Sequence, residues 1–129
     1  MEIRDNSLKS LMVVDDDDQL RNLLKEIFSR INYQVITACD GADALKKMMQ
    51  VKVDLVILDL IMPEKEGIET LSDIRVNYPE TKIMAVSGGS HQLNAPMLLN
   101  IAQTLGADDV LKKPFDLNEI IEAVDKLLN

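Results

Sequence analysis

Acidic side chains gather in a run of four aspartates, Asp15 to Asp18, directly after the apolar segment Leu11–Val14. Like charges placed side by side at the end of a buried strand cost free energy unless a cation binds there. Carboxylate oxygens suit a hard cation such as Mg²⁺, which usually keeps positions open for water and phosphate. The run therefore predicts a divalent-cation site that can support phosphate chemistry.

Three further polar residues stand at the ends of other short apolar segments, namely Asp59, Ser87 and Lys113. Asp59 can attack phosphorus as a carboxylate nucleophile. Lys113 can contact a phosphoryl oxygen or, when no phosphate is present, Asp59 itself, and the Ser87 hydroxyl can bind a second phosphoryl oxygen. Phosphoryl transfer depends mostly on positioning and charge neutralisation, and these groups supply both.

Short apolar segments alternate along the chain with helix-like patterns, in which apolar residues recur every three or four positions. Five repeats of strand and helix predict an α/β fold, with a parallel sheet covered by helices on both faces. The carboxyl ends of parallel strands meet at one edge, so the polar residues above should converge there. The predicted strands are Leu11–Val14, Val35–Ala38, Leu55–Leu58, Ile83–Val86 and Val110–Leu111.

Several local signals mark where the predicted helices begin and end. Asp18 is expected to cap the start of the first helix. Asp116 and Glu119 form a capping-box pattern before the last helix. Gly106 is expected to end the fourth helix. Four methionines are expected to pack in the core or on helix faces: Met48, Met49, Met84 and Met97.

Composition limits the classes of function that the chain can serve. Its 129 residues fit one domain over residues 1–129, without an output domain. The net charge of −8 argues against direct nucleic-acid binding, since that affinity comes mainly from Lys and Arg. The single cysteine allows neither an internal disulfide nor a thiolate zinc cluster. No signal peptide or membrane-length apolar run is present, so a cytoplasmic protein is expected.

Four motifs, in order and spread over nearly the whole chain, resemble the receiver domains of two-component response regulators, the CheY-like superfamily. Each motif alone is weak, but the set is specific. The resemblance implies a flavodoxin-like three-layer sandwich with strand order 2-1-3-4-5. The motifs are Val-Val-Asp-Asp-Asp (13–17), Leu-Asp-Leu-Ile-Met-Pro (58–63) with Gly67, Val-Ser-Gly (86–88) and Lys-Lys-Pro-Phe (112–115).

The resemblance also implies roles for single residues. Asp59 corresponds to the phosphorylated aspartate, Ser87 to the switch hydroxyl and Lys113 to the family's lysine, whose bond to Pro114 is often cis. The phosphoryl group would come from a sensor histidine kinase or a histidine phosphotransfer protein, and small phosphodonors often substitute. Such a bacterial regulator is not an enzyme beyond promoting its own phosphorylation and dephosphorylation.

The implied metal ligands are Asp15, Asp16, Asp59 and the main-chain carbonyl of Ile61, with Mg²⁺ as the cation and Mn²⁺ as an alternative. Phosphorylation would draw Ser87 inward and remodel the face formed by the fourth helix, fifth strand and fifth helix. That face would then bind an unidentified downstream protein, an output domain or a second phosphorylated copy of the chain.

The sequence departs from the family pattern at three places. Val110 stands where receivers commonly carry an aromatic residue that changes rotamer in the switch. Residues 88–97 form a glycine-containing loop, and we expect ordering of this loop to replace the aromatic switch. Its His91 is expected to be a surface residue. Ile61 has no polar group to orient an attacking water, so a long-lived phosphoaspartate is predicted.

Three other functions use similar residues. An aspartate-nucleophile phosphohydrolase needs a second acid two residues after its nucleophile, and Ile61 occupies that position. An FMN-binding flavodoxin needs a phosphate-cradling loop after its first strand, where Asp15–Asp18 would repel phosphate. A degenerate receiver that binds partners without phosphorylation is the third alternative.

Overall fold

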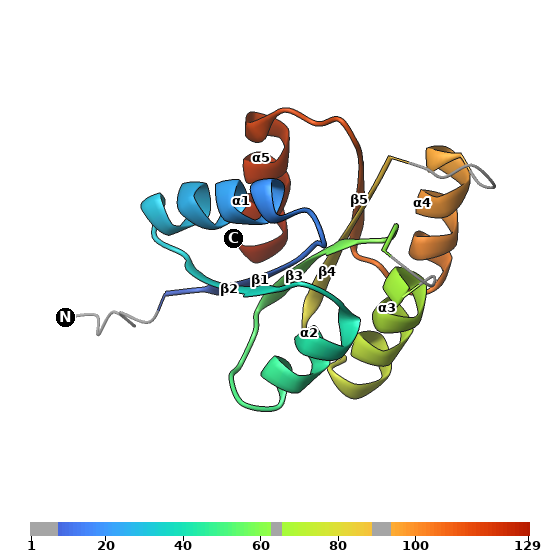
Figure 1. Cartoon of the computed structure of the whole chain (residues 1–129), viewed down its shortest axis with the longest axis horizontal. Coiled ribbons are helices and arrows are strands. Elements are labelled where there is room, and N and C mark those ends of the chain that lie inside the picture. The colour runs from blue at the N-terminus through green and yellow to red at the C-terminus, as the bar shows by residue number, and fades with distance from the viewer. Residues whose placement is uncertain (1–7, 63–65, 89–93) are drawn as a thin grey trace.

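A five-stranded parallel sheet forms the centre of the protein, in the order β2-β1-β3-β4-β5 (Figure 1). The computed structural model describes residues 8–62, 66–88 and 94–129. Both the α/β class and the predicted strand order 2-1-3-4-5 are confirmed. The strands are β1 (Ser10–Val14), β2 (Gln34–Ala38), β3 (Leu55–Asp59), β4 (Lys82–Ser87) and β5 (Asp109–Lys112).

Helices cover both faces of the sheet and complete the predicted three-layer sandwich. In Figure 1, α1 and α5 lie on one face, and α2, α3 and α4 lie on the other. Two separate apolar clusters match this division, one packed under each group of helices. The helices are α1 (Asp18–Arg30), α2 (Gly41–Met48), α3 (Glu66–Asn77), α4 (Ala95–Thr104) and α5 (Leu117–Leu128).

The central strands explain why the apolar runs are continuous rather than alternating. Successive side chains of a strand point to opposite faces, and both faces of this sheet are covered. In β1, Leu11 and Val13 join the cluster under α1 and α5, whereas Met12 and Val14 join the cluster under the other helices. A polar residue inside such a strand would be buried, so polar residues can appear only where the strand ends.

The predicted helix ends are confirmed in two of three cases. Asp116 and Glu119 form the capping box of α5. Gly106 follows α4 with a φ of 110°, a left-handed conformation that favours glycine. The cap predicted at Asp18 is wrong, because Asp17 caps α1: its side chain accepts hydrogen bonds from the N–H groups of Gln19 and Leu20. Asp18 lies in the first helical turn, where it pairs with Arg21.

The methionines divide into two groups. Met48 and Met84 are buried, as expected. Met49 and Met97 are 80% and 50% exposed, so their predicted packing is wrong. Met49 comes after the last residue of α2, and Met97 lies between the buried α4 residues Ala95 and Leu98 without being buried itself. Among the residues that the structure describes, no helix is long and apolar enough to cross a membrane.

Candidate functional site

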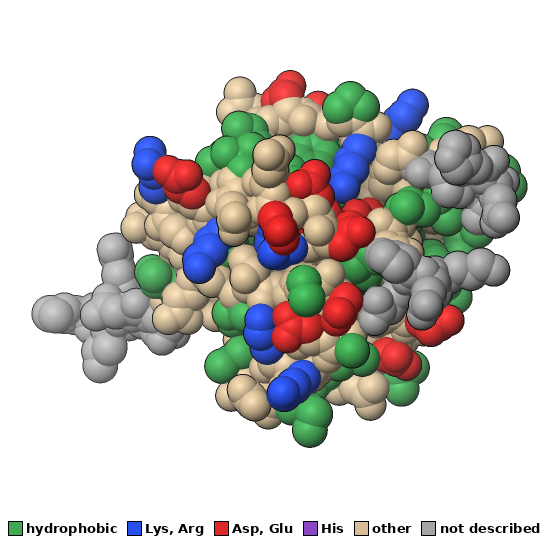
Figure 2. Space-filling view, viewed as in Figure 1, with side chains coloured by type: hydrophobic (Ala, Val, Ile, Leu, Met, Phe, Trp, Pro, Cys, Tyr) green, Lys and Arg blue, Asp and Glu red, His purple; other side chains and the backbone are tan. Residues whose placement is uncertain are grey.

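The carboxyl edge of the sheet, where its strands end, brings the predicted polar residues together. Asp15 follows β1, Asp59 ends β3, Ser87 ends β4 and Lys113 follows β5. Asp15, Asp59 and Ser87 are 4%, 5% and 0% exposed, respectively. Asp16 is exposed and lies beside them. In Figure 2, acidic side chains gather in the middle of the visible face, over the start of α1 and α2.

Lys113 lies between the two buried carboxylates. Its Nζ donates to Asp15 Oδ2 at 3.1 Å and to Asp59 Oδ2 at 3.3 Å. Its main-chain N–H donates to the Ser87 carbonyl at 3.0 Å, which aligns the end of β5 with the end of β4. The ammonium therefore contacts Asp59 directly, which is one of the two contacts predicted for Lys113.

The electrostatics of this edge favour a proton or a cation on Asp59. Burial raises the pKa of Asp59 to about 6; the Lys113 charge opposes this shift and the Asp15 charge adds to it. Burial alone would lower the pKa of Lys113, but the charges of Asp59 and Asp15 outweigh it and the pKa is raised. Lys113 therefore stays charged, and Asp59 is mainly ionised only above the pH of its raised pKa.

The cluster of three aspartates has the oxygen donors and the negative charge that a Mg²⁺ site needs. Asp15, Asp16 and Asp59 each offer one carboxylate oxygen, and these atoms lie within 4.8 Å of one another. Oxygen donors are what Mg²⁺ requires, and ionised carboxylates outnumber the single ammonium of Lys113 by two charges. The Ile61 N–H donates to Asp59 Oδ1 at 3.0 Å, which orients the carboxylate. The residues present therefore fit a divalent cation, while the Ile61 carbonyl remains a predicted ligand.

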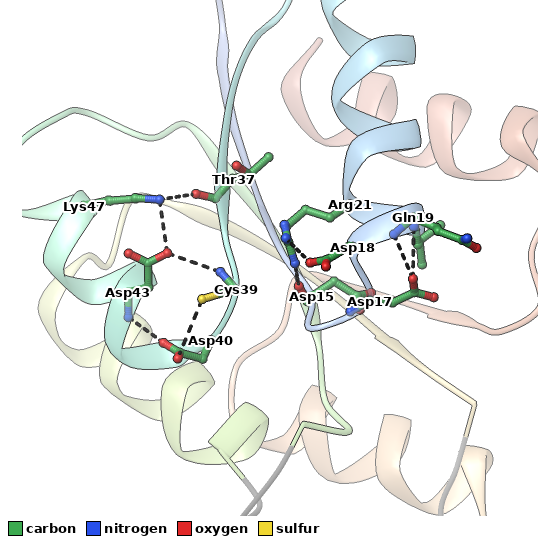
Figure 3. Close-up of polar contacts among 11 residues, drawn as sticks. Asp15, Asp17, Asp18, Gln19, Arg21, Thr37, Cys39, Asp40, Asp43 and Lys47 are labelled. Carbon is green, nitrogen blue, oxygen red and sulfur yellow. Dashed lines mark hydrogen bonds and ion pairs between the residues drawn. The ribbon is translucent and has the colours of Figure 1, made fainter.

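The loop between β1 and α1 is held by a network of polar contacts (Figure 3). Asp15 Oδ1 accepts the Asp17 N–H at 2.9 Å. Arg21 donates to the Asp15 main-chain carbonyl at 2.7 Å and also pairs with the Asp18 carboxylate. Sequence reasoning missed Arg21, although its position three residues after Asp18, a neighbour on a helix, was an available signal.

Comparison with known proteins identifies the family. A family model described as the response regulator receiver domain matches residues 11–125. The chain belongs to this family. The predicted resemblance to receiver domains is thereby confirmed, and the chain is the receiver domain of a two-component response regulator.

Individual relatives show how the receiver domain occurs in other proteins. The chain is 37% identical over 121 residues to the transcriptional regulatory protein CpxR of Escherichia coli, covering 94% of the chain and 50% of CpxR. It is 33% identical over 117 residues to the chemotaxis protein CheY of Listeria monocytogenes, covering 90% of the chain and 95% of CheY. The receiver therefore spans about half the length of one relative and nearly all of the other.

A solved structure provides the same comparison in three dimensions. The response regulator TrrA from Thermotoga maritima, crystallised in complex with Mg²⁺-BeF, has a TM-score of 0.80 and 36% identity. The match covers 94% of this chain and 100% of that one. The fold of the receiver is thus found in a protein whose crystal contains Mg²⁺.

Two backbone features of the receiver shape the site. The Lys113–Pro114 peptide bond is cis, as the family resemblance predicts. Gly67, near the start of α3, lies so close to β3 that a Cβ atom there would be 2.5 Å from the main chain of Leu60 and 2.6 Å from the Asp59 carbonyl. Only glycine allows this approach, so Gly67 fixes the distance between α3 and the end of the strand that carries Asp59.

The three places where the sequence departs from the family pattern have different structural surroundings. Val110 is partly buried and packs against the cluster under α2, α3 and α4. Ile61 is 36% exposed, and its side chain offers only carbon to the site. Residues 89–93, which are half of the loop predicted at 88–97 and include His91, lie outside the described residues, as does the end of the second motif at Pro63. The far end of that predicted loop is wrong, because residues 95–97 already belong to α4.

Proposed function

We propose that the protein is a Mg²⁺-dependent phosphoacceptor in which Asp59 receives a phosphoryl group from a histidine kinase, a histidine phosphotransfer protein or a small phosphodonor. The observation that carries this proposal is the buried Asp59 carboxylate, which is bonded to Lys113 on one oxygen and to the Ile61 N–H on the other. Its plane is fixed before the donor arrives, and positioning of this kind is a large part of phosphoryl-transfer catalysis.

The chemical step is a displacement at phosphorus. An oxygen of the ionised Asp59 forms a bond to the phosphorus of a phosphohistidine while the P–N bond breaks, and the imidazole nitrogen leaves with the electron pair. The Lys113 ammonium moves from carboxylate to phosphoryl oxygen, and the Ser87 hydroxyl donates to another. Burial lowers the pKa of Lys113, but the charges of Asp59 and Asp15 together raise it above its ordinary value, so the lysine is charged when the donor arrives.

The metal would be held by Asp15, Asp16, Asp59 and the Ile61 carbonyl. When bound, Mg²⁺ supplies positive charge that offsets the repulsion between the carboxylates and the incoming phosphoryl oxygens. Mn²⁺ accepts the same oxygen donors and is a second candidate.

The output of the site is a change of surface. Ser87 ends β4 directly beside β5, so its movement toward a phosphoryl group would be transmitted to the face formed by α4, β5 and α5. We propose that this face binds a downstream protein, an output domain or a second copy of the receiver. The residues 1–129 act as one receiver domain in the bacterial cytoplasm, without direct nucleic-acid contact or enzymatic turnover of other substrates.

Intact-mass spectrometry after incubation with acetyl phosphate tests the proposal. With Mg²⁺, the wild type should gain the mass of one phosphoryl group, and the Asp59→Asn variant should not. A wild type that stays unmodified in Mg²⁺ would favour the degenerate receiver. Steady release of phosphate from p-nitrophenyl phosphate would favour the phosphohydrolase instead.

A further inference from the structure

Arg21 is a largely buried cation at the edge of the acid cluster. Its side chain is only 15% exposed, although the Asp18 side chain with which it pairs is 79% exposed. One guanidinium nitrogen donates to the Asp15 main-chain carbonyl at 2.7 Å, and another contacts the Asp18 carboxylate. Its own N–H donates to the Asp17 carbonyl at 3.0 Å. Arg21 thus contacts the acidic loop through main chain as well as side chain.

The contact of Arg21 with the Asp15 carbonyl also affects the next residue, Asp16. It belongs to the peptide unit that joins Asp15 to Asp16, and a peptide unit is planar. Holding this oxygen therefore also holds the Cα atom of Asp16, to which the Asp16 side chain is attached. Asp15 itself has other supports, because its carboxylate accepts from Lys113 and the Asp17 N–H, and its own N–H donates to Ala38. Asp16 is exposed and depends more on the loop backbone.

We propose that Arg21 is a positioning residue for the divalent-cation site. By fixing the Asp15–Asp16 peptide, it keeps the Asp16 carboxylate beside those of Asp15 and Asp59, within the 4.8 Å that the cluster spans. This inference rests on the metal site of the proposed function, and it concerns cation affinity rather than phosphoryl transfer.

The charge of Arg21 and its positioning role have opposite effects on Mg²⁺ affinity. A bare guanidinium near the cluster would repel a divalent cation, so its removal would tighten binding. Asp18 pairs with Arg21 and offsets that charge. The sign of the change in affinity therefore separates the two roles: loss of positioning weakens Mg²⁺ binding, whereas loss of repulsion strengthens it.

Titration calorimetry with MgCl₂ measures this sign directly. Arg21→Met keeps the apolar stem but removes both guanidinium contacts, and we expect its dissociation constant for Mg²⁺ to rise about tenfold, as for other residues that orient metal ligands. Arg21→Lys retains one donor for the Asp15 carbonyl and should recover part of the affinity. Arg30→Met is the matched control on the same helix, because Arg30 is 76% exposed and, among the described residues, pairs with Glu26 alone. The Mg²⁺ affinity of this variant should equal that of the wild type.

A metal-free measurement separates positioning from general instability. In the Arg21→Met variant without Mg²⁺, the Asp17 amide, which is hydrogen-bonded to Asp15, should exchange its proton faster, while amides in the centre of β3 keep their protection. If Arg21→Met does not fold, Arg21→Gln is measured under the same criterion. Mg²⁺ binding by the Met or Gln variant that is as tight as the wild type, or tighter, overturns the inference.

The outcomes also distinguish this inference from the proposed function. A wild type that binds Mg²⁺ but is not phosphorylated refutes the proposed function and leaves the positioning role standing. A wild type that is phosphorylated, with an Arg21→Met variant of unchanged Mg²⁺ affinity, refutes the positioning role alone. A wild type that binds no Mg²⁺ refutes both.

Discussion

At the amino edge of the sheet, Arg75 donates hydrogen bonds to three carbonyls and one carboxylate. At the carboxyl edge, by contrast, the single charge of Lys113 lies between two carboxylates. Arg75 donates to the carbonyls of Gly106, Pro79 and Thr81 at 3.0–3.2 Å and to the Asp108 carboxylate at 2.7 Å. Asp108 also accepts the Ile83 N–H at 2.8 Å. Arg75 and Asp108 thus balance each other's charge and hydrogen-bond the main chain of the segments around them.

The carboxyl edge leaves its charges unbalanced. Asp15 and Asp59 are buried with a single ammonium, and the pKa of Asp59 is raised to about 6. Binding of a proton, a cation or a phosphoryl group with its cation would stabilise such a site, which is typical of functional sites. The contrast indicates that the amino edge stabilises the fold, and that the carboxyl edge gives up stability for chemistry.

Removal of the amino-edge cation should have the largest effect. Arg75→Met removes the guanidinium that donates to Asp108 and to three carbonyls, and we expect a loss of about 3 kcal/mol in the free energy of unfolding. Urea denaturation measures it, with the exposed Arg30→Met as a control that should change stability by less than about 0.5 kcal/mol. A loss no larger than that of the control would show that the amino edge is not the stabilising one.

Neutralising the acceptor should have the opposite effect. Because the pKa of Asp59 is raised from 3.8 to about 6, the folded state binds this proton more tightly than the unfolded state. The resulting stabilisation is complete below about pH 4 and is lost as pH rises through 6. Asp59→Asn should therefore be about 2–3 kcal/mol more stable than the wild type at pH 7, with a difference that vanishes toward pH 4.

Denaturation at a series of pH values compares the two proteins. Asp15→Asn serves as a reference in which one neighbouring charge is removed but Asp59 is kept. An Asp59→Asn variant less stable than the wild type at pH 7 would mean that the charge of Asp59 does not destabilise the folded state.

The contact between α3 and β3 should have an intermediate effect. Gly67→Ala places a Cβ 2.5 Å from the Leu60 main chain, so the helix or the strand must move. We expect a loss of about 2 kcal/mol in stability, together with slower phosphorylation by acetyl phosphate. Gly88→Ala is the matched control, since its Cβ would lie at an ordinary 3.6 Å from Lys113 Cβ and, within the described part of the chain, meet nothing closer. Equal behaviour of the two variants would remove the proposed role of Gly67.

The lifetime of the phosphorylated state should show the smallest effect in free energy. Ile61 offers no polar side-chain group to orient an attacking water, so Ile61→Asn should speed loss of the phosphoryl group roughly tenfold. Ile61→Val, which stays apolar, should match the wild type. The decay of the phosphorylated mass with time gives both rates, and an unchanged rate in Ile61→Asn would contradict the prediction.

The positions of Asp59, Ser87 and Lys113 at one edge could be predicted from the sequence, because each follows an apolar run and parallel strands end at a common edge. The choice of Asp17 rather than Asp18 as the helix cap could not. Two neighbouring aspartates are equivalent in local propensity, and the choice between them coincides with the contact of Arg21 with Asp18 and the Asp15 carbonyl. The approach of Gly67 to β3 likewise depends on how two elements pack.

The most direct test locates the phosphoryl group. The wild type is incubated with acetyl phosphate in Mg²⁺ or in EDTA, then treated with borohydride, which reduces an acyl phosphate to an alcohol and marks the residue that carried it. Peptide mass spectrometry should find the reduced residue at position 59 in Mg²⁺ and not in EDTA. A mark at another aspartate, or an equal mark at Asp59 without the cation, would contradict the account.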